Sequence, residues 1–128
     1  MGGVFGVGVP TYLDLVAWQK AMKLALPVYD VTHTWPRNEL YGLTSQTRRA
    51  TLSVATYVAV GKRRLGAREF HHHLSIAHGS LCEAETCLLV AKELDLIDAT
   101  TLESIMYAAD RRGWTPHPGS DAQTSPKP

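Results

Sequence analysis

The stretch 69-EFHHHLSIAHGSLCEAETCLLVAKELD-95 contains an unbroken apolar heptad. Its apolar residues recur at alternating steps of four and three, and they are Phe70, Leu74, Ala77, Leu81, Ala84, Leu88 and Ala91. This spacing places them along one side of a single helix. Large and small side chains alternate along the stripe, as two closely packed helices require. The stretch therefore predicts a long helix that follows an N-cap at Gly66, ends near Leu94 and packs against a second helix.

Two more helices are predicted before this one. The first covers residues 14–34, and its expected apolar stripe consists of Leu15, Trp18, Met22, Ala25 and Tyr29. Pro27 lies inside this helix and should bend it, because proline lacks a backbone N–H. The second covers residues 42–64, after a short 3₁₀ connector. Thr and Val are frequent there, so a strand over residues 51–60 is the alternative, but the heptad spacing favours a helix.

A shorter helix is predicted after the long one. Thr100 and Glu103 have capping-box spacing and mark its expected start, and Gly113 suits its C-terminal end. Its apolar face consists of Leu102, Ile105, Met106 and Ala109. Four helices with short connections and no strand signal predict an all-α fold, an antiparallel up-down four-helix bundle.

The 128 residues suit a single domain, and 45% apolar and 20% charged residues are ordinary for a soluble protein. We expect a flexible N-terminal arm over residues 1–11, the bundle over 12–113 and a disordered, Pro- and Ser-rich tail over 114–128. No apolar run is long enough to span a membrane, and the N-terminus does not resemble a signal peptide. A cytoplasmic protein is therefore expected.

The helices carry more apolar residues than one stripe each can hold. Those off the predicted stripes are Leu24, Val28, Val31, Ile76, Cys87, Val90 and Leu94. We expect some of this excess to be buried between subunits of a homo-oligomer. Gly79 and Ser80 weaken the long helix at its middle, which predicts close approach of another backbone there.

The two cysteines, Cys82 and Cys87, lie five residues apart on the long helix. They point roughly 140° away from each other, so they cannot form a disulfide within that helix. Buried free thiols are expected for both, with a metal pair as the alternative.

The net charge of +1 is unevenly distributed. Residues 1–70 hold nine Lys and Arg against four Asp and Glu, whereas residues 71–128 hold four against eight. The densest basic cluster consists of Lys62, Arg63, Arg64 and Arg68, at the turn before the long helix. We interpret it as a candidate nucleic-acid-binding surface, and the alternative is a solvated helix end. If all six histidines were protonated, the net charge would rise from +1 to +7, so polyanion binding should depend on pH.

Two further arginines lie in the middle of the second predicted helix. Arg48 and Arg49 flank Ala50, and each could grip a phosphate or pair with an acidic residue of the long helix, Glu83 or Glu85. We predict phosphate contact for Arg48 and a structural ion pair between Arg49 and Glu83.

Catalytic and metal-binding patterns are weak. His71, His72, His73 and His78 include no pair at the i, i+4 spacing of a helical zinc pair, although Glu69 and His73 have it. Surface or interface histidines are expected instead. Bases could stack on aromatic rings, but helical spacing favours core or interface positions for Trp18, Tyr29, Trp35 and Tyr41. With no nucleophile–base pair and no Gly-rich phosphate loop, we predict no enzyme, no cofactor and no metal.

Three segments resemble the 23S ribosomal RNA intervening-sequence (S23) family over residues 12–112. They are 15-LVAWQKAM-22, similar to "L-x-x-W-Q-K-A"; 39-ELYGLTSQTRRA-50, similar to "E-x-Y-G-L-T-S-Q-x-R-R-A"; and Glu69-Phe70 with 74-LSIAHGSLCE-83, similar to "E-F-x-x-x-L-x-I-A-x-G-S-L-x-E". The family pattern "S-I-P-x-N-I-A-E-G" reads 53-SVATYVAVG-61 here, so Ala55, Tyr57 and Val60 replace its proline, asparagine and glutamate. The run His71–His73 is also outside the pattern.

The resemblance implies a cytosolic bacterial helical bundle that assembles into a homopentameric ring. It also implies kinship with the accessory variability determinant of diversity-generating retroelements, which binds nucleic acid and a reverse transcriptase. We therefore expect a non-enzymatic scaffold or accessory factor whose partners are copies of itself and RNA, DNA or a reverse transcriptase, with no membrane. The alternative is a protein–protein interaction module with no nucleic-acid affinity.

Overall fold

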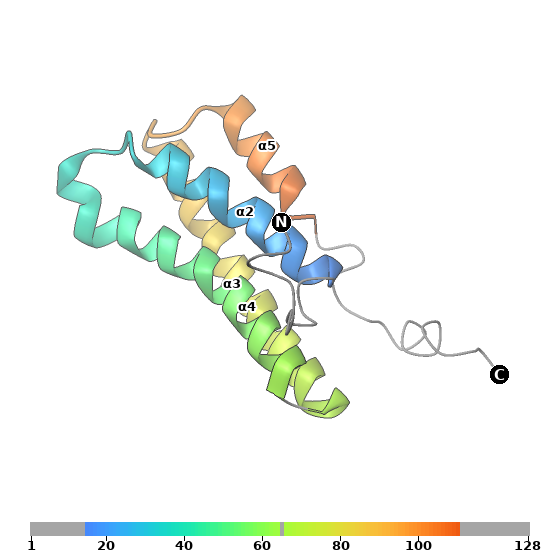
Figure 1. The fold of residues 1–128 in the computed structure, drawn as a ribbon. Helices are drawn as coiled ribbons and strands as arrows, with labels where there is room; N and C mark the ends of the chain where they lie inside the picture. The colour runs from blue at the N-terminus through green and yellow to red at the C-terminus, as the bar shows by residue number, and fades with distance from the viewer. Residues whose placement is uncertain (1–14, 65, 111–128) are drawn as a thin grey trace, which may run out of the picture.

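The computed structural model describes residues 15–64 and 66–110, which form helices joined by short turns (Figure 1). The α-helices are α2 (Val16–Thr32), α3 (Ser45–Arg64), α4 (Ala67–Glu93) and α5 (Ala99–Ala108). A 3₁₀ turn, η2 (Arg37–Glu39), and a π-helical turn, η3 (Leu40–Thr44), connect α2 to α3. The described residues include no strand, so the all-α prediction is confirmed and the strand alternative over residues 51–60 is wrong. The predicted arm, the tail and the end at Gly113 lie outside the described residues.

Of the described helices, α3 and α4 form the most extensive pair, and they lie side by side (Figure 1). Helix α2 packs against α3, and α5 packs against both α2 and α4. The apolar side chains between these helices form one buried cluster. Since all four helices contribute to that cluster, the candidate functional surfaces lie on one continuous scaffold.

The apolar heptad of α4 faces this core, as predicted. Its fully buried members are Leu74, Ala77, Leu81, Ala84, Leu88 and Ala91. Phe70 is half-buried and packs against the cluster. Gly66 is the N-cap, Glu69 lies in the first turn and Leu94 is the C-cap, so both predicted ends of this helix are confirmed.

The buried face of helix α2 is rotated from the expected one: of the predicted stripe, Ala25 is buried, whereas Leu15, Trp18 and Met22 are half-buried and pack against the core. Its buried residues are Ala17, Ala21, Leu24, Ala25, Val28 and Thr32. Leu24 and Val28 therefore belong to the core of the single chain, and their assignment to surplus surface is wrong. The small side chains of Ala17 and Ala21 let the α2 backbone approach its neighbours, which places the bulkier Trp18 at the edge of the core.

The threonines of α3 are compatible with a helix because their hydroxyls bond back to the preceding turn. Thr47 Oγ1 donates to the Leu43 carbonyl over 2.6 Å, and Thr51 Oγ1 donates to the Arg48 carbonyl over 2.9 Å. Both threonines are fully buried, so these bonds avoid the cost of unpaired polar groups. The helix begins at Ser45 rather than at Gly42, whose backbone is non-helical.

The end of α4 is a Schellman motif built on a residue other than glycine. The Leu96 N–H donates to the Ala91 carbonyl over 2.8 Å, and the Asp95 N–H donates to the Lys92 carbonyl over 3.0 Å. Asp95 takes the left-handed conformation at φ 62°, which glycine adopts without a steric cost.

We expect Asp95→Gly to raise the free energy of unfolding by about 0.5–1 kcal/mol. Urea denaturation measures this change, and a less stable variant would contradict the assignment.

Helix α5 begins two residues earlier than its sequence signal. The N-cap is Asp98, whose Oδ1 accepts a hydrogen bond from the Thr101 N–H over 2.7 Å. The capping box assigned to Thr100 and Glu103 is therefore wrong. A short aspartate side chain in the extended conformation reaches the first free N–H groups, and Thr100 is already inside the helix.

The Asp98 cap should make stability depend on pH. Hydrogen bonds from the backbone N–H and the side chain of Thr101 lower the pKa of Asp98. Because the folded pKa is below the unfolded one, the stabilisation is present above about pH 4 and is lost as the pH falls further. We expect Asp98→Ala to lower Tm at neutral pH, with a smaller difference from the wild type near pH 3. Asp98→Asn keeps an acceptor and is the control; equal Tm values for wild type and Asp98→Ala at neutral pH would contradict the cap.

Candidate nucleic-acid interface

The predicted basic cluster lies where α3 ends and α4 begins. Lys62, Arg63 and Arg64 are in the last turn of α3, and Arg68 is in the first turn of α4. Lys62 and Arg68 are exposed, while the side chains of Arg63 and Arg64 lie outside the described part of the structure. We call these four residues the basic turn. The helix ends bring them together because only residues 65 and 66 separate α3 from α4.

Helices α3 and α4 pack closely next to the basic turn. Gly61 is buried, and a Cβ added there would lie 2.8 Å from the His73 Cβ and 3.1 Å from the Phe70 Cδ1. Lys62 Nζ lies 5.7 Å from the centroid of the Phe70 ring, a distance at which a cation is attracted to the ring face. The absence of a side chain at Gly61 thus lets both helices meet directly beneath Lys62.

Arg48 lies elsewhere, between α3 and α2. Its Nε donates to Thr32 Oγ1 over 2.7 Å, and its guanidinium carbon lies 5.0 Å from the centroid of the Tyr29 ring. Arg48 is fourteen positions before Lys62, which is about 21 Å along a helix. The structure therefore does not bring Arg48 to the basic turn, and its contacts join two helices. Its phosphate contact stays a prediction.

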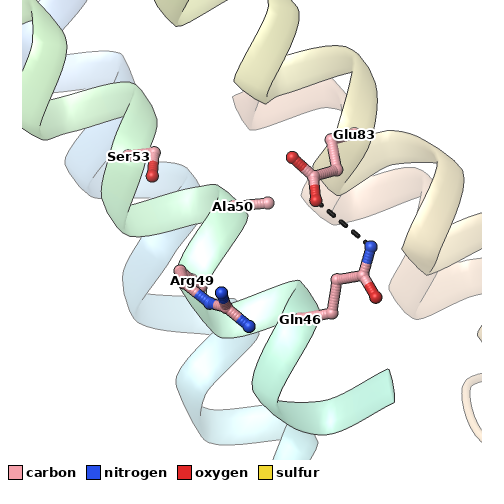
Figure 2. Close-up of a pocket in the computed structure, with 5 residues that line it drawn as sticks. All are labelled: Gln46, Arg49, Ala50, Ser53 and Glu83. Carbon is pink, nitrogen blue, oxygen red and sulfur yellow. Dashed lines mark hydrogen bonds between the residues drawn. The ribbon is translucent and has the colours of Figure 1, made fainter. Parts of the chain in front are cut away.

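An open pocket of about 360 Å³ lies between α3 and α4 at the level of Arg49 (Figure 2). Its lining residues are Gln46, Arg49, Ala50, Ser53 and Glu83. Gln46 Nε2 donates to Glu83 Oε2 over 3.2 Å, as Figure 2 shows. Arg49 and Glu83 thus line one pocket, and the ion pair between them stays a prediction. Gln46 was not predicted from the sequence, although the i, i+3, i+4, i+7 spacing of the four α3 residues marks one helix face.

The cysteines differ in environment. Cys87 is buried, and desolvation raises the pKa of its thiol despite a hydrogen bond with Thr47. Cys82 is exposed, so the prediction that both thiols are buried is wrong for this residue. Its position five residues before a core residue turns it away from the helix pair. In residues 15–64 and 66–110, no three His, Cys, Asp or Glu side chains are grouped as a metal site would require.

Among the described residues, no helix combines the length and the apolar character needed to cross a bilayer.

Comparison with known proteins assigns the chain to a family. A family model described as 23S rRNA-intervening sequence protein matches residues 13–113. A comparison with curated proteins gives no match. The matched region contains every described helix and the basic turn. The chain therefore belongs to the 23S rRNA-intervening sequence protein family.

Proposed function

We propose that this protein is a non-enzymatic, cytoplasmic scaffold or accessory factor that binds RNA through the basic turn. The observation that carries the proposal is the gathering of four cations around one connection between helices. Residues 61–73 contain Glu69 as their single acidic residue, so Lys62, Arg63, Arg64 and Arg68 give this segment a charge of 4 − 1 = +3 with neutral histidines. A family described by its relation to 23S rRNA is compatible with an RNA partner.

The N-terminus of α4 adds to this positive potential. Its N-cap, Gly66, has no side chain to accept hydrogen bonds from the first N–H groups of the helix. Helix N-termini carry partial positive charge and favour phosphate groups. The side-chain cations and the helix dipole therefore act in the same direction at this end of the molecule.

We also propose that the four helices form an antiparallel up-down bundle and that copies assemble into a homopentamer. The outer side of α4 supports assembly, because Leu89, Val90 and Leu94 are 50%, 43% and 53% exposed. Nothing in the described part of the chain lies within 4 Å of a Cβ added at Gly79, which leaves room for a backbone from another copy. A ring would repeat the basic turn once per subunit and convert a small charge cluster into an extended rim.

A salt titration tests the RNA proposal. The full chain is mixed with labelled single-stranded RNA, and with DNA of the same sequence, at about 50 and 200 mM salt. Four phosphate contacts on a single strand predict binding that is about 50-fold weaker at the higher salt concentration than at the lower one. No binding at the lower salt concentration would contradict the proposal and favour the alternative, a protein-interaction module. Exposed apolar side chains also favour that alternative, and Tyr41 is an example because it is 93% exposed.

Light scattering after size exclusion tests the assembly separately. At micromolar concentration we expect the mass of five chains of 14.1 kDa each, and Leu89→Ala with Leu94→Ala should shift the population toward smaller species. These two leucines are half-exposed, so their loss should leave the helical content of the chain unchanged. A monomeric wild type would contradict the assembly.

A further inference from the structure

Three consecutive histidines follow the basic turn on α4, and the proposed function above does not use them. His72 is exposed, whereas His71 and His73 are half-buried. On a helix, three consecutive residues cover roughly 200° of the circumference, so the run surrounds more than half of α4 at this level. The histidines thus lie one turn from Arg68 and on the same end of the α3–α4 pair as Lys62.

The ring of His71 is linked to the cation Lys62 through the ring of Phe70. The Phe70 ring contacts Lys62 and also His71, whose ring centroid lies 6.4 Å from that of Phe70 at an interplanar angle of 77°. Protonation of His71 would therefore place a second positive charge near the Phe70 ring, which Lys62 already contacts. One aromatic ring thus joins a titratable side chain to a cation of the basic turn.

His73 is held so that it can gain a proton without losing its hydrogen bond. Its Nδ1 lies 3.1 Å from the Glu69 carbonyl oxygen. A carbonyl only accepts, so Nδ1 carries the hydrogen and Nε2 is the atom that takes a second proton. The ring also packs against Tyr57 and His72, with centroid distances of 5.9 Å in each case. Protonation can therefore change the charge of this end while leaving the backbone bond in place.

The charged and titratable groups around the run are two cations, one carboxylate and one phenol. From α3 they are Lys62 and Tyr57, and from α4 they are Arg68 and Glu69. Residues 61–73 have a charge of +3 with neutral histidines, and three protons raise it to 3 + 3 = +6. One carboxylate in this segment cannot balance that change, whereas a row of phosphates can.

We infer that His71, His72 and His73 are part of the RNA-binding surface and that mild acid strengthens RNA binding at the basic turn. This inference rests on the proposed function and specifies its regulation. Histidine changes charge between about pH 5 and 8, and bound phosphates favour the charged form. Binding should therefore take up protons, and each protonated histidine that contacts a phosphate of single-stranded RNA should steepen the slope of log K against log salt concentration by about 0.7.

The test uses the full chain and oligo-uridine, because uridine gains no proton in mild acid. Dissociation constants are measured at about pH 7.5 and 5.5, each over a series of salt concentrations. We expect binding at least about 10-fold tighter at the lower pH and a salt slope steeper by about 1–2. His71→Asn, His72→Asn and His73→Asn combined should remove this pH dependence. His33→Asn, at the exposed C-cap of α2, is the matched control and should retain it.

The outcomes separate the inference from the proposed function. Wild-type affinity that is equal at both pH values, or a triple variant that keeps the pH dependence, would overturn the inference and leave RNA binding intact. No binding at either pH at low salt would overturn the proposed function as well. If circular dichroism shows that the triple variant is unfolded, His72→Asn alone replaces it, because this side chain is exposed. The single variant should show a smaller increase in salt slope between about pH 7.5 and 5.5 than the wild type. An increase equal to that of the wild type would contradict the inference.

Discussion

Replacing Lys62, Arg63, Arg64 and Arg68 with alanine should weaken RNA binding by at least about 100-fold at about 50 mM salt. The physical reason is counterion release: each cation that neutralises a phosphate of single-stranded RNA contributes about 0.7 to the slope of log K against log salt concentration. Removing four contacts should therefore lower that slope by about 3. Filter binding or fluorescence anisotropy over a salt series measures both quantities.

A second quadruple variant provides the matched control. Lys23, Arg37, Arg49 and Lys92 lie on the described helices and connector, away from the basic turn. Changing them to alanine alters the net charge by the same amount but should leave the affinity within about 3-fold of the wild type, since long-range effects are screened beyond about 10 Å. Equal losses in both variants would show that total charge, rather than the basic turn, attracts RNA.

Leu81→Ala should cost about 3–5 kcal/mol of unfolding free energy, the largest stability change expected for one substitution here. Leu81 is fully buried at the middle of the α4 stripe, and it belongs to the cluster that α2, α3 and α5 share. The truncation removes apolar contacts and leaves a cavity that the surrounding helices can only partly close. Thermal unfolding by circular dichroism should show Tm lowered by at least about 10 °C.

Leu26→Ala makes the same chemical change on an exposed site. Leu26 is 64% exposed on α2, so we expect its loss to change stability by less than about 0.5 kcal/mol. Comparing the two leucines separates burial from helix propensity, because both replacements put alanine into a helix. Similar Tm values for the two variants would contradict the assignment of the α4 stripe to the core.

The sequence predicted the buried face of a helix best where only one apolar stripe fitted the helical period. In α4 the apolar stripe and the N-cap at Gly66 agree, and the structure follows both. In α2, two stripes fit the same period: one through Trp18 and Met22, the other through Ala17 and Ala21. Spacing alone could not choose between them, because the choice depends on how closely small side chains let neighbouring helices approach.

In the candidate site, too, some residue positions could be predicted from the sequence and others could not. The positions of Lys62 and Arg68 followed from chain connectivity, since a two-residue break must keep the ends of α3 and α4 together. The roles of Arg48 and Gln46 depended on which side chains of other helices lie opposite them, Thr32 and Glu83. A single sequence does not contain that information, because the rotation of each helix is set by packing of the whole core.

Cross-linking of bound RNA tests the location of the interface most directly. The full chain is irradiated with photoreactive oligo-uridine at low salt, digested and analysed by mass spectrometry to map the attached peptides. We predict that cross-links concentrate in residues 62–73, which hold the basic turn and the histidine run. Cross-links that fall on α2 or α5 instead, with none between residues 62 and 73, would contradict the account.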